Sequence, residues 1–181
     1  MKRFSGDISI VLGGAAGQGV QTVEALLVSV LKREGYHVFA TKEYMSRIRG
    51  GSNSTEIRIT NKRRASFVER IDLLFALDKD VLPHLEHRIT KDTIVLGERD
   101  KVCTMTTCPV VNVPFTQFAN ELGNPIYTST VAVGIVLGML EADLSVLQSY
   151  LKERFARKGD EVVAKNLEAA EKGYAFGAHI A

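Results

Sequence analysis

The pattern of apolar and polar positions predicts short strands separated by helices. Apolar runs rich in β-branched residues are typical of strands covered on both faces. We predict strands of this kind at residues 8–12, 36–41, 73–77, 93–96 and 110–113. Residues 55–60 instead alternate Glu56, Arg58 and Thr60 with isoleucine, which predicts a strand with one solvent-facing side.

Helical periodicity is clearest at residues 20–34, where apolar side chains recur every three or four positions before Gly35. With the strands at 8–12 and 36–41, this helix forms a β-α-β unit. Asp143 is a candidate N-cap, and Gly173 is expected to close the last helix. The further helices are predicted at residues 81–87, 116–122, 131–140, 144–155 and 160–172.

Strands that alternate with helices favour an α/β fold. We predict a doubly wound, Rossmann-like, mostly parallel sheet with helices on both faces and a helical C-terminal part. The 181 residues, 45% of them hydrophobic and 24% charged, suit a single domain over residues 1–181. No internal repeat or linker interrupts it.

Composition narrows the partners and the compartment. The net charge of +2 gives no case for nucleic-acid binding, although residues 42–64 alone carry a net +5. The N-terminus lacks the apolar stretch of a signal peptide, and residues 131–140 are too few to span a bilayer. We therefore expect a soluble, cytoplasmic protein with no membrane contact.

Cys103 and Cys108 are too few, and too unusually spaced, for an iron–sulfur cluster or a structural zinc. Two free thiols in a reducing cytosol and a disulfide between the pair are the two interpretations.

A loop with four glycines joins the first strand to the first helix. Glycines let a backbone turn tightly, and the helix that follows points free N–H groups at an anion. The spacing Gly14-x-x-Gly17-x-Gly19 does not match the dinucleotide fingerprint, and no Gly-Lys-Ser or Gly-Lys-Thr follows. The loop is therefore either a contact for an anionic ligand or a partner backbone, or a tight turn made for packing.

A basic segment at residues 42–54 follows the second strand. Arg47 and Arg49 can offer paired hydrogen bonds to phosphate or carboxylate, and Gly50-Gly51 allows close approach. In a parallel sheet the segment leaves at the same end as the glycine loop, where open α/β sheets bind ligands. A solvated basic loop is the alternative.

No nucleophile and base can be assembled from the remaining residues. His37, His84, His87 and His179 occur in unrelated contexts without metal-ligand spacing, and His84 and His87 are expected at the surface. A chain without its own catalytic set is either a binding domain or one subunit of a larger enzyme.

Three stretches together resemble the gamma subunit of 2-oxoacid:ferredoxin oxidoreductases. They are residues 14–22 (Gly-Ala-Ala-Gly-Gln-Gly-Val-Gln-Thr), residues 44–51 (Tyr-Met-Ser-Arg-Ile-Arg-Gly-Gly) and residues 54–59. The resemblance runs through the whole chain and is strongest over residues 8–60. It looks most like the branch in which this domain can be fused ahead of the alpha chain, so we expect either a free gamma subunit or an excised domain.

The resemblance implies a share in the oxidative decarboxylation of a 2-oxoacid to an acyl-coenzyme A, with electrons passed to ferredoxin. It favours 2-oxoglutarate over pyruvate or a branched-chain 2-oxoacid. Thiamine diphosphate, Mg²⁺ and 4Fe-4S clusters are expected on the alpha, beta and iron–sulfur (delta) partner subunits, and no catalytic or metal-binding residue on this chain. It also implies a role near the coenzyme A entrance, with these binding positions: Gly14, Gly17, Gln18, Gly19, Arg47, Arg49, Gly50 and Gly51.

Two rival interpretations remain open. The chain can be a free-standing nucleotide-binding or sensing module outside redox chemistry. Both loops can also be interface elements that bind a partner backbone and no small ligand, because arginine and glycine serve both purposes.

Overall fold

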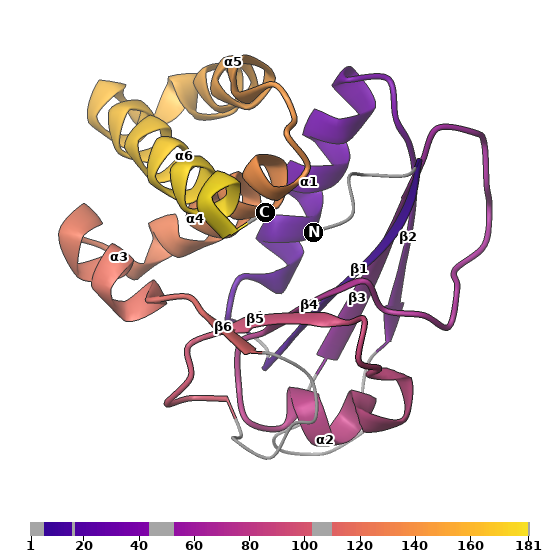
Figure 1. Ribbon diagram of the computed structural model, residues 1–181. Coiled ribbons are helices and arrows are strands. Elements are labelled where there is room, and N and C mark those ends of the chain that lie inside the picture. The colour runs from indigo at the N-terminus through magenta and orange to yellow at the C-terminus, as the bar shows by residue number, and fades with distance from the viewer. Residues whose placement is uncertain (1–5, 16, 44–52, 103–109, 181) are drawn as a thin grey trace.

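The computed structural model describes residues 6–15, 17–43, 53–102 and 110–180. They form a six-stranded sheet with the order β2-β3-β1-β4-β5-β6 (Figure 1). The strands are β1 (Asp7–Gly14), β2 (His37–Glu43), β3 (Asn53–Thr60), β4 (Leu73–Ala76), β5 (Ile94–Gly97) and β6 (Val110–Asn112).

The helices agree with the predicted periodicity in position. They are α1 (Val20–Arg33), α2 (Val81–Leu85), α3 (Phe115–Leu122), α4 (Thr128–Met139), α5 (Leu144–Phe155) and α6 (Asp160–Ile180), with 3-10 turns η1 (Glu86–Arg88), η2 (Pro125–Tyr127) and η3 (Ala156–Lys158). Asp143 caps α5 as predicted, because its carboxylate accepts the N–H of Ser145 at 2.8 Å.

Helices cover both faces of the sheet, which confirms the predicted fold class. One face packs Ile10, Ile57 and Phe75 against α1 and the α4–α6 group. The other face packs Val11 and Leu74 against α2. Figure 1 shows α2 on the opposite side of the sheet from α1 and from the C-terminal helices. The helix that follows β1, α1, and the helix that follows β4, α2, therefore lie on opposite faces of the sheet, and the carboxyl ends of these two strands lie between them.

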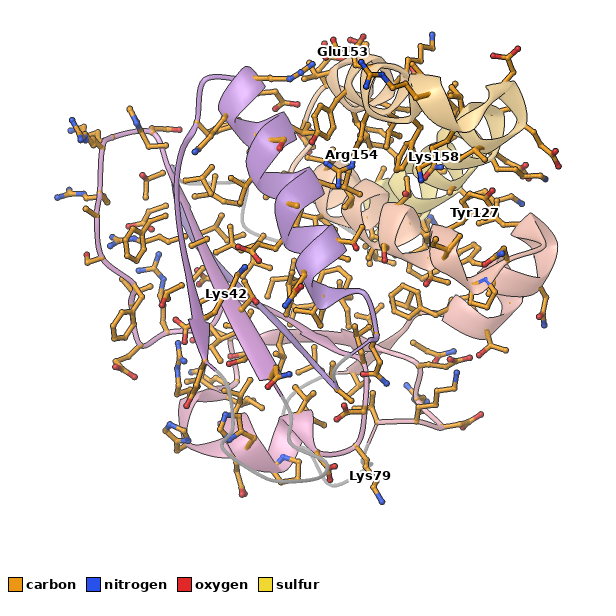
Figure 2. All side chains as sticks on the ribbon, turned by 180° about the vertical axis from the view of Figure 1, so that it is seen from behind. Lys42, Lys79, Tyr127, Glu153, Arg154 and Lys158 are labelled. Carbon is orange, nitrogen blue, oxygen red and sulfur yellow. The ribbon has the colours of Figure 1, made fainter. Side chains whose placement is uncertain are left out.

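The sheet is mixed, because β3 runs antiparallel to both β1 and β2 and lies between them. The pairs β1–β4, β4–β5 and β5–β6 are parallel. The predicted β-α-β unit is therefore split by β3, although β1 and β2 still point the same way. Lys42 of β2 pairs with Glu24 of α1 at 2.9 Å and ties this edge strand to the helix layer (Figure 2).

The predicted solvent-facing side of β3 was wrong, since Glu56 is only 9% and Thr60 only 4% exposed. Arg88 of η1 covers this face, pairs with Glu56 and donates to the carbonyl oxygen of Glu69 at 2.9 Å. Arg58 makes a two-pronged contact with Asp7, at 3.0 and 2.7 Å. The alternation of polar and apolar residues predicted this strand correctly. Its charged side chains, however, are paired, and Arg88 of η1 covers them.

The predicted end of the last helix at Gly173 was also wrong, because α6 continues to Ile180. Gly173 lies inside the crossing of α6 with α4, where a Cβ would collide with the Val131 carbonyl oxygen. Gly177 meets Ile135 in the same way, and a Cβ on Gly134 of α4 would lie 2.5 Å from the Ala170 carbonyl oxygen. These glycines allow two backbones to touch and do not end a helix.

In the described part of the chain, no helix is both long and apolar enough to cross a membrane.

Candidate functional site

The glycine loop ends β1 and opens α1 with a backbone that only glycine adopts easily. Gly17 (φ +90°) and Gly19 (φ +84°) are both left-handed. Gly19 is the N-cap of α1, and among the described residues no side chain caps the helix there. A helix start of this kind offers its first N–H groups and the positive end of the helix dipole to an anion.

The other glycines of the loop are needed for packing. A Cβ on Gly13 would collide with Val81 of α2, and one on Gly14 would lie 2.7 Å from the Gln18 carboxamide oxygen. Among the residues that the structure describes, none would lie within 4 Å of a Cβ on Gly17, so its φ of +90° is the described reason for a glycine there.

The Gln18 side chain braces the loop. Its carboxamide oxygen accepts the N–H of Ala15 at 2.7 Å, and its amide nitrogen lies 3.5 Å from the carbonyl oxygen of Leu77. The loop is thereby held to the end of β4. This arrangement gives Gln18 a positioning role in the loop, with its carboxamide turned toward the protein.

A cavity of about 280 Å³ lies between the glycine loop, the first turn of α1 and the start of β3. Asn53, Ser54 and Thr55 form its far side. The register pairs Gly14 with Asn53 and Glu43 with Ser54. Glu43 and Asn53, the described residues on either side of segment 44–52, therefore lie at the same end of the sheet as Gly14.

Of the predicted binding positions, Gly14, Gly17 and Gly19 line this cavity together. Four further positions, Arg47, Arg49, Gly50 and Gly51, fall in segment 44–52 and lie outside the described residues. Their flanking residues, Glu43 and Asn53, are the part of the predicted second loop that the structure places.

A larger cavity of about 500 Å³ lies on the other side of the glycine loop. Its lining includes Gln18, Lys101, Phe115, Ile126 and Ser129. We missed this side from the sequence, because its residues come from the ends of four separate elements and share no motif. The position of Lys101 soon after the strand β5 was the one available signal.

Lys101 and Glu98 line the larger cavity, and Thr116 hydrogen-bonds to both of them. Lys101 Nζ lies 2.7 Å from Glu98 Oε2 and donates to Thr116 Oγ1 at 2.7 Å, and that hydroxyl donates to Glu98 at 2.9 Å. Burial raises the pKa of Glu98, but the hydrogen bonds from Lys101 and Thr116 outweigh it and hold the pKa below its usual range. Glu98 is therefore ionised at neutral pH and holds the ammonium of Lys101 in place.

The predicted surface position of His84 needs correction. Its side chain is only 19% exposed, and Nε2 lies 3.5 Å from a carboxylate oxygen of Glu43. The residue therefore packs against the end of β2. Among the described residues, no group of three or more His, Cys, Asp or Glu side chains can hold a metal ion. Cys103 and Cys108 lie outside those residues.

The family model described as "Pyruvate ferredoxin/flavodoxin oxidoreductase" matches residues 9–176, which is nearly the whole chain. The chain therefore belongs to this family. Its fold is similar to that of the pyruvate oxidoreductase subunit PORC from Thermotoga maritima, at a TM-score of 0.75 and 23% identity, with 94% of this chain and 97% of that chain covered. The gamma subunit of the keto/oxoacid ferredoxin oxidoreductase from Geobacter sulfurreducens gives a TM-score of 0.76 at 18% identity, with 95% and 99% of the two chains covered.

Longer proteins contain the same fold as one part. The 2-oxoglutarate:ferredoxin oxidoreductase from Magnetococcus marinus, solved with 2-oxoglutarate, coenzyme A and succinyl-CoA bound, matches at a TM-score of 0.86 and 22% identity over 98% of this chain and 32% of that one. A 2-oxoacid:ferredoxin oxidoreductase subunit alpha from a Sulfolobus species is 32% identical over 75 residues, or 41% of this chain. The chain spans only 12% of that relative's length.

Proposed function

We propose that this chain is the gamma unit of a 2-oxoacid:ferredoxin oxidoreductase. The assembly would convert a 2-oxoacid and coenzyme A to an acyl-coenzyme A and CO₂, with two electrons passed to ferredoxin. The substrate we favour is 2-oxoglutarate. Family membership over residues 9–176 supports the assembly, and the likeness to the Magnetococcus structure, which holds 2-oxoglutarate and succinyl-CoA, supports the substrate.

Within the assembly, we propose that the chain supports the catalytic core and contributes to coenzyme A binding. The observation that carries this role is the cavity bounded by the start of α1 on one side and the first residues of β3, Asn53–Thr55, on the other. Coenzyme A carries a diphosphate and a 3′-phosphate, which are suited to helix N–H groups and to arginine forks.

The residues of this chain would act by binding and orientation alone. The glycine loop would present its N–H groups to a phosphate, Gln18 would keep the loop in shape, and Arg47 and Arg49 would neutralise the phosphate charge. Thiamine diphosphate, Mg²⁺ and iron–sulfur clusters would lie on the alpha, beta and delta chains and supply the carbon and electron chemistry there.

Purification from the source cell, with identification of the associated chains, tests the assembly. We expect thiamine-diphosphate-binding and iron–sulfur chains to co-purify with this one, and the complex to reduce ferredoxin in the presence of a 2-oxoacid and coenzyme A. A chain that purifies without such partners, and whose melting temperature rises strongly with NAD or ATP, would instead be a free-standing nucleotide-binding module.

A further inference from the structure

The strand β2 forms one long edge of the sheet. It is the terminal strand of the sheet, and among the described residues it pairs with β3 alone (Figure 1). The strand at the opposite edge, β6, has three residues, whereas β2 has seven, contains no proline and keeps an unbroken register with β3. An edge strand of this length pairs with other strands unless charge, proline or a bulge blocks it.

The register identifies the backbone groups that this edge offers. Asn61 donates to the Gly6 carbonyl oxygen at 2.9 Å, which turns the odd-numbered residues of β3 toward β1 and its even-numbered residues toward β2. β2 therefore bonds β3 through its own odd-numbered residues. The N–H and C=O groups of its even-numbered residues, Val38, Ala40 and Lys42, point away from β3.

The charged side chains around β2 do not block this edge. Lys42 pairs with Glu24 at 2.9 Å and is thereby held against α1, on one face of the sheet (Figure 2). Arg88 lies over the opposite face, where it pairs with Glu56 of β3. Ala40, at the centre of β2, is exposed. A second strand can therefore approach in the plane of the sheet.

Two copies of β2 are complementary when they run antiparallel. In the register centred on Ala40, Val38 meets Lys42 and Ala40 meets its own copy, so all the outward backbone groups of both strands bond each other. A shift by two residues leaves some of these groups without a partner. The same register sets His37 opposite Glu43 at both ends, where an imidazole N–H can donate to a carboxylate. The Glu43 side chain is 56% exposed and thus accessible to a second copy.

We propose that β2 is an interface with a second copy of this chain, in which the two edges pair antiparallel about Ala40 and form one continuous sheet. The match of His37 with Glu43 favours a second copy over an unrelated strand. This inference goes beyond the proposed function and does not depend on coenzyme A, since it involves the β2 backbone and no ligand. In the assembled enzyme the interface joins two gamma units.

Analytical ultracentrifugation of the purified chain tests the interface. We expect a dimer, and a dissociation constant that rises about a hundredfold in Ala40→Pro because the central hydrogen bonds of both copies are lost. Proline at this position removes none of the N–H groups that bond β3, so the protomer keeps its sheet. Ala40→Thr keeps the N–H and suits a strand, and this matched control should leave the constant unchanged.

The ends of the strand pair are tested by charge, in variants that leave the backbone groups in place. His37→Glu sets two carboxylates opposite each other at both ends and should raise the dissociation constant about tenfold. Addition of Glu43→Lys to His37→Glu restores opposite charges and should recover most of the affinity. The matched control is His87→Glu, the same change at an exposed histidine of η1, which should leave the constant unchanged.

Hydrogen exchange locates the interface on the chain. As the protein concentration rises through the dissociation constant, exchange should slow at the N–H groups of Val38, Ala40 and Lys42. A chain that stays monomeric overturns the inference, as does a dimer that both Ala40→Pro and His37→Glu leave intact. Slowed exchange at these groups in the assembled enzyme, with the chain alone monomeric, would also overturn it, because the added strand would then come from a different subunit.

Discussion

The Gln18 carboxamide oxygen accepts the N–H of Ala15 at 2.7 Å, so the loop that faces the cavities is held in shape by one of its own side chains. The same oxygen lies 2.7 Å from where a Cβ on Gly14 would be. Gly14 and Gln18 therefore depend on each other. This relationship accounts for the glycine at position 14, the first of a Gly14-x-x-Gly17-x-Gly19 spacing that neither the dinucleotide nor the ATP-binding loop uses.

Two substitutions of Gln18 separate loop shape from charge. Gln18→Glu keeps an oxygen for the Ala15 N–H but adds a negative charge, so we expect it to fold normally and to raise the Michaelis constant for coenzyme A about tenfold. Gln18→Ala removes the brace and should lower the free energy of unfolding by about 1 kcal/mol. Steady-state kinetics and denaturant unfolding measure these effects. A Gln18→Glu enzyme with unchanged affinity for coenzyme A would show that no anion binds at the loop.

The crossing of α4 and α6 should not tolerate a methyl group. An exposed helical Gly→Ala change stabilises a helix by about 1 kcal/mol, but in Gly173→Ala the Cβ collides with the Val131 carbonyl oxygen. We expect Gly173→Ala to lower the free energy of unfolding by about 2–3 kcal/mol. The control Ala175→Gly, at an exposed position of the same helix, should cost about 1 kcal/mol through helix propensity alone. Stabilisation by Gly173→Ala would contradict this packing.

The buried Arg88–Glu56 pair should depend strongly on both partners, whose side chains are only 9% and 11% exposed. Arg88→Met leaves the Glu56 carboxylate buried without its cation, and we expect a loss of about 3–5 kcal/mol. In the double variant Arg88→Met with Glu56→Leu, most of that loss should be recovered. Thermal unfolding of Arg88→Met, of Glu56→Leu and of the double variant gives the coupling free energy, and simple additivity of the two single effects would rule out a direct pair.

Acid should weaken the fold partly through Asp7. Hydrogen bonds from Arg58 hold the pKa of Asp7 below its usual range in the folded state. The stabilisation is therefore full at neutral pH and is lost as the pH falls from the usual aspartate range through the lowered pKa. Asp7→Asn should remove up to about 1 kcal/mol near neutral pH and flatten the acid limb of the stability curve. If the stability of Asp7→Asn falls with acid in the same way as that of the unchanged protein, the acid sensitivity comes from other carboxylates.

Local patterns predicted the elements well, because helix and strand periodicity is a property of neighbouring residues. Residues 20–34 and 144–155 agree with α1 and α5 within one residue at each end. Non-local pairing was not predictable in the same way. The insertion of β3 between β1 and β2 depends on which strands meet, and the covered face of β3 depends on Arg88, which lies 32 residues from Glu56.

The site was half predicted for the same reason. The glycine loop is contiguous in sequence and its spacing shows that it is unusual. The wall that faces it combines Lys101, which follows β5, with Phe115 of α3 and Ile126 of η2, and only the fold brings them to one cavity. Gly173 shows the converse, since a residue that commonly ends helices serves here for helix–helix contact, and its partner residues are over 30 positions away.

The Michaelis constant for coenzyme A in the assembled enzyme, measured with Arg47 and Arg49 both changed to alanine, tests the central claim most directly. We expect a rise of tenfold or more with the assembly intact, because contacts between arginine and phosphate contribute about 1.5–3 kcal/mol each. The matched control changes Lys62 and Arg64 to alanine, two exposed cations of the same basic stretch beyond the far end of β3, and should leave the constant unchanged. An unchanged constant in the arginine variant, or loss of the complex, would contradict a coenzyme A site at these two loops.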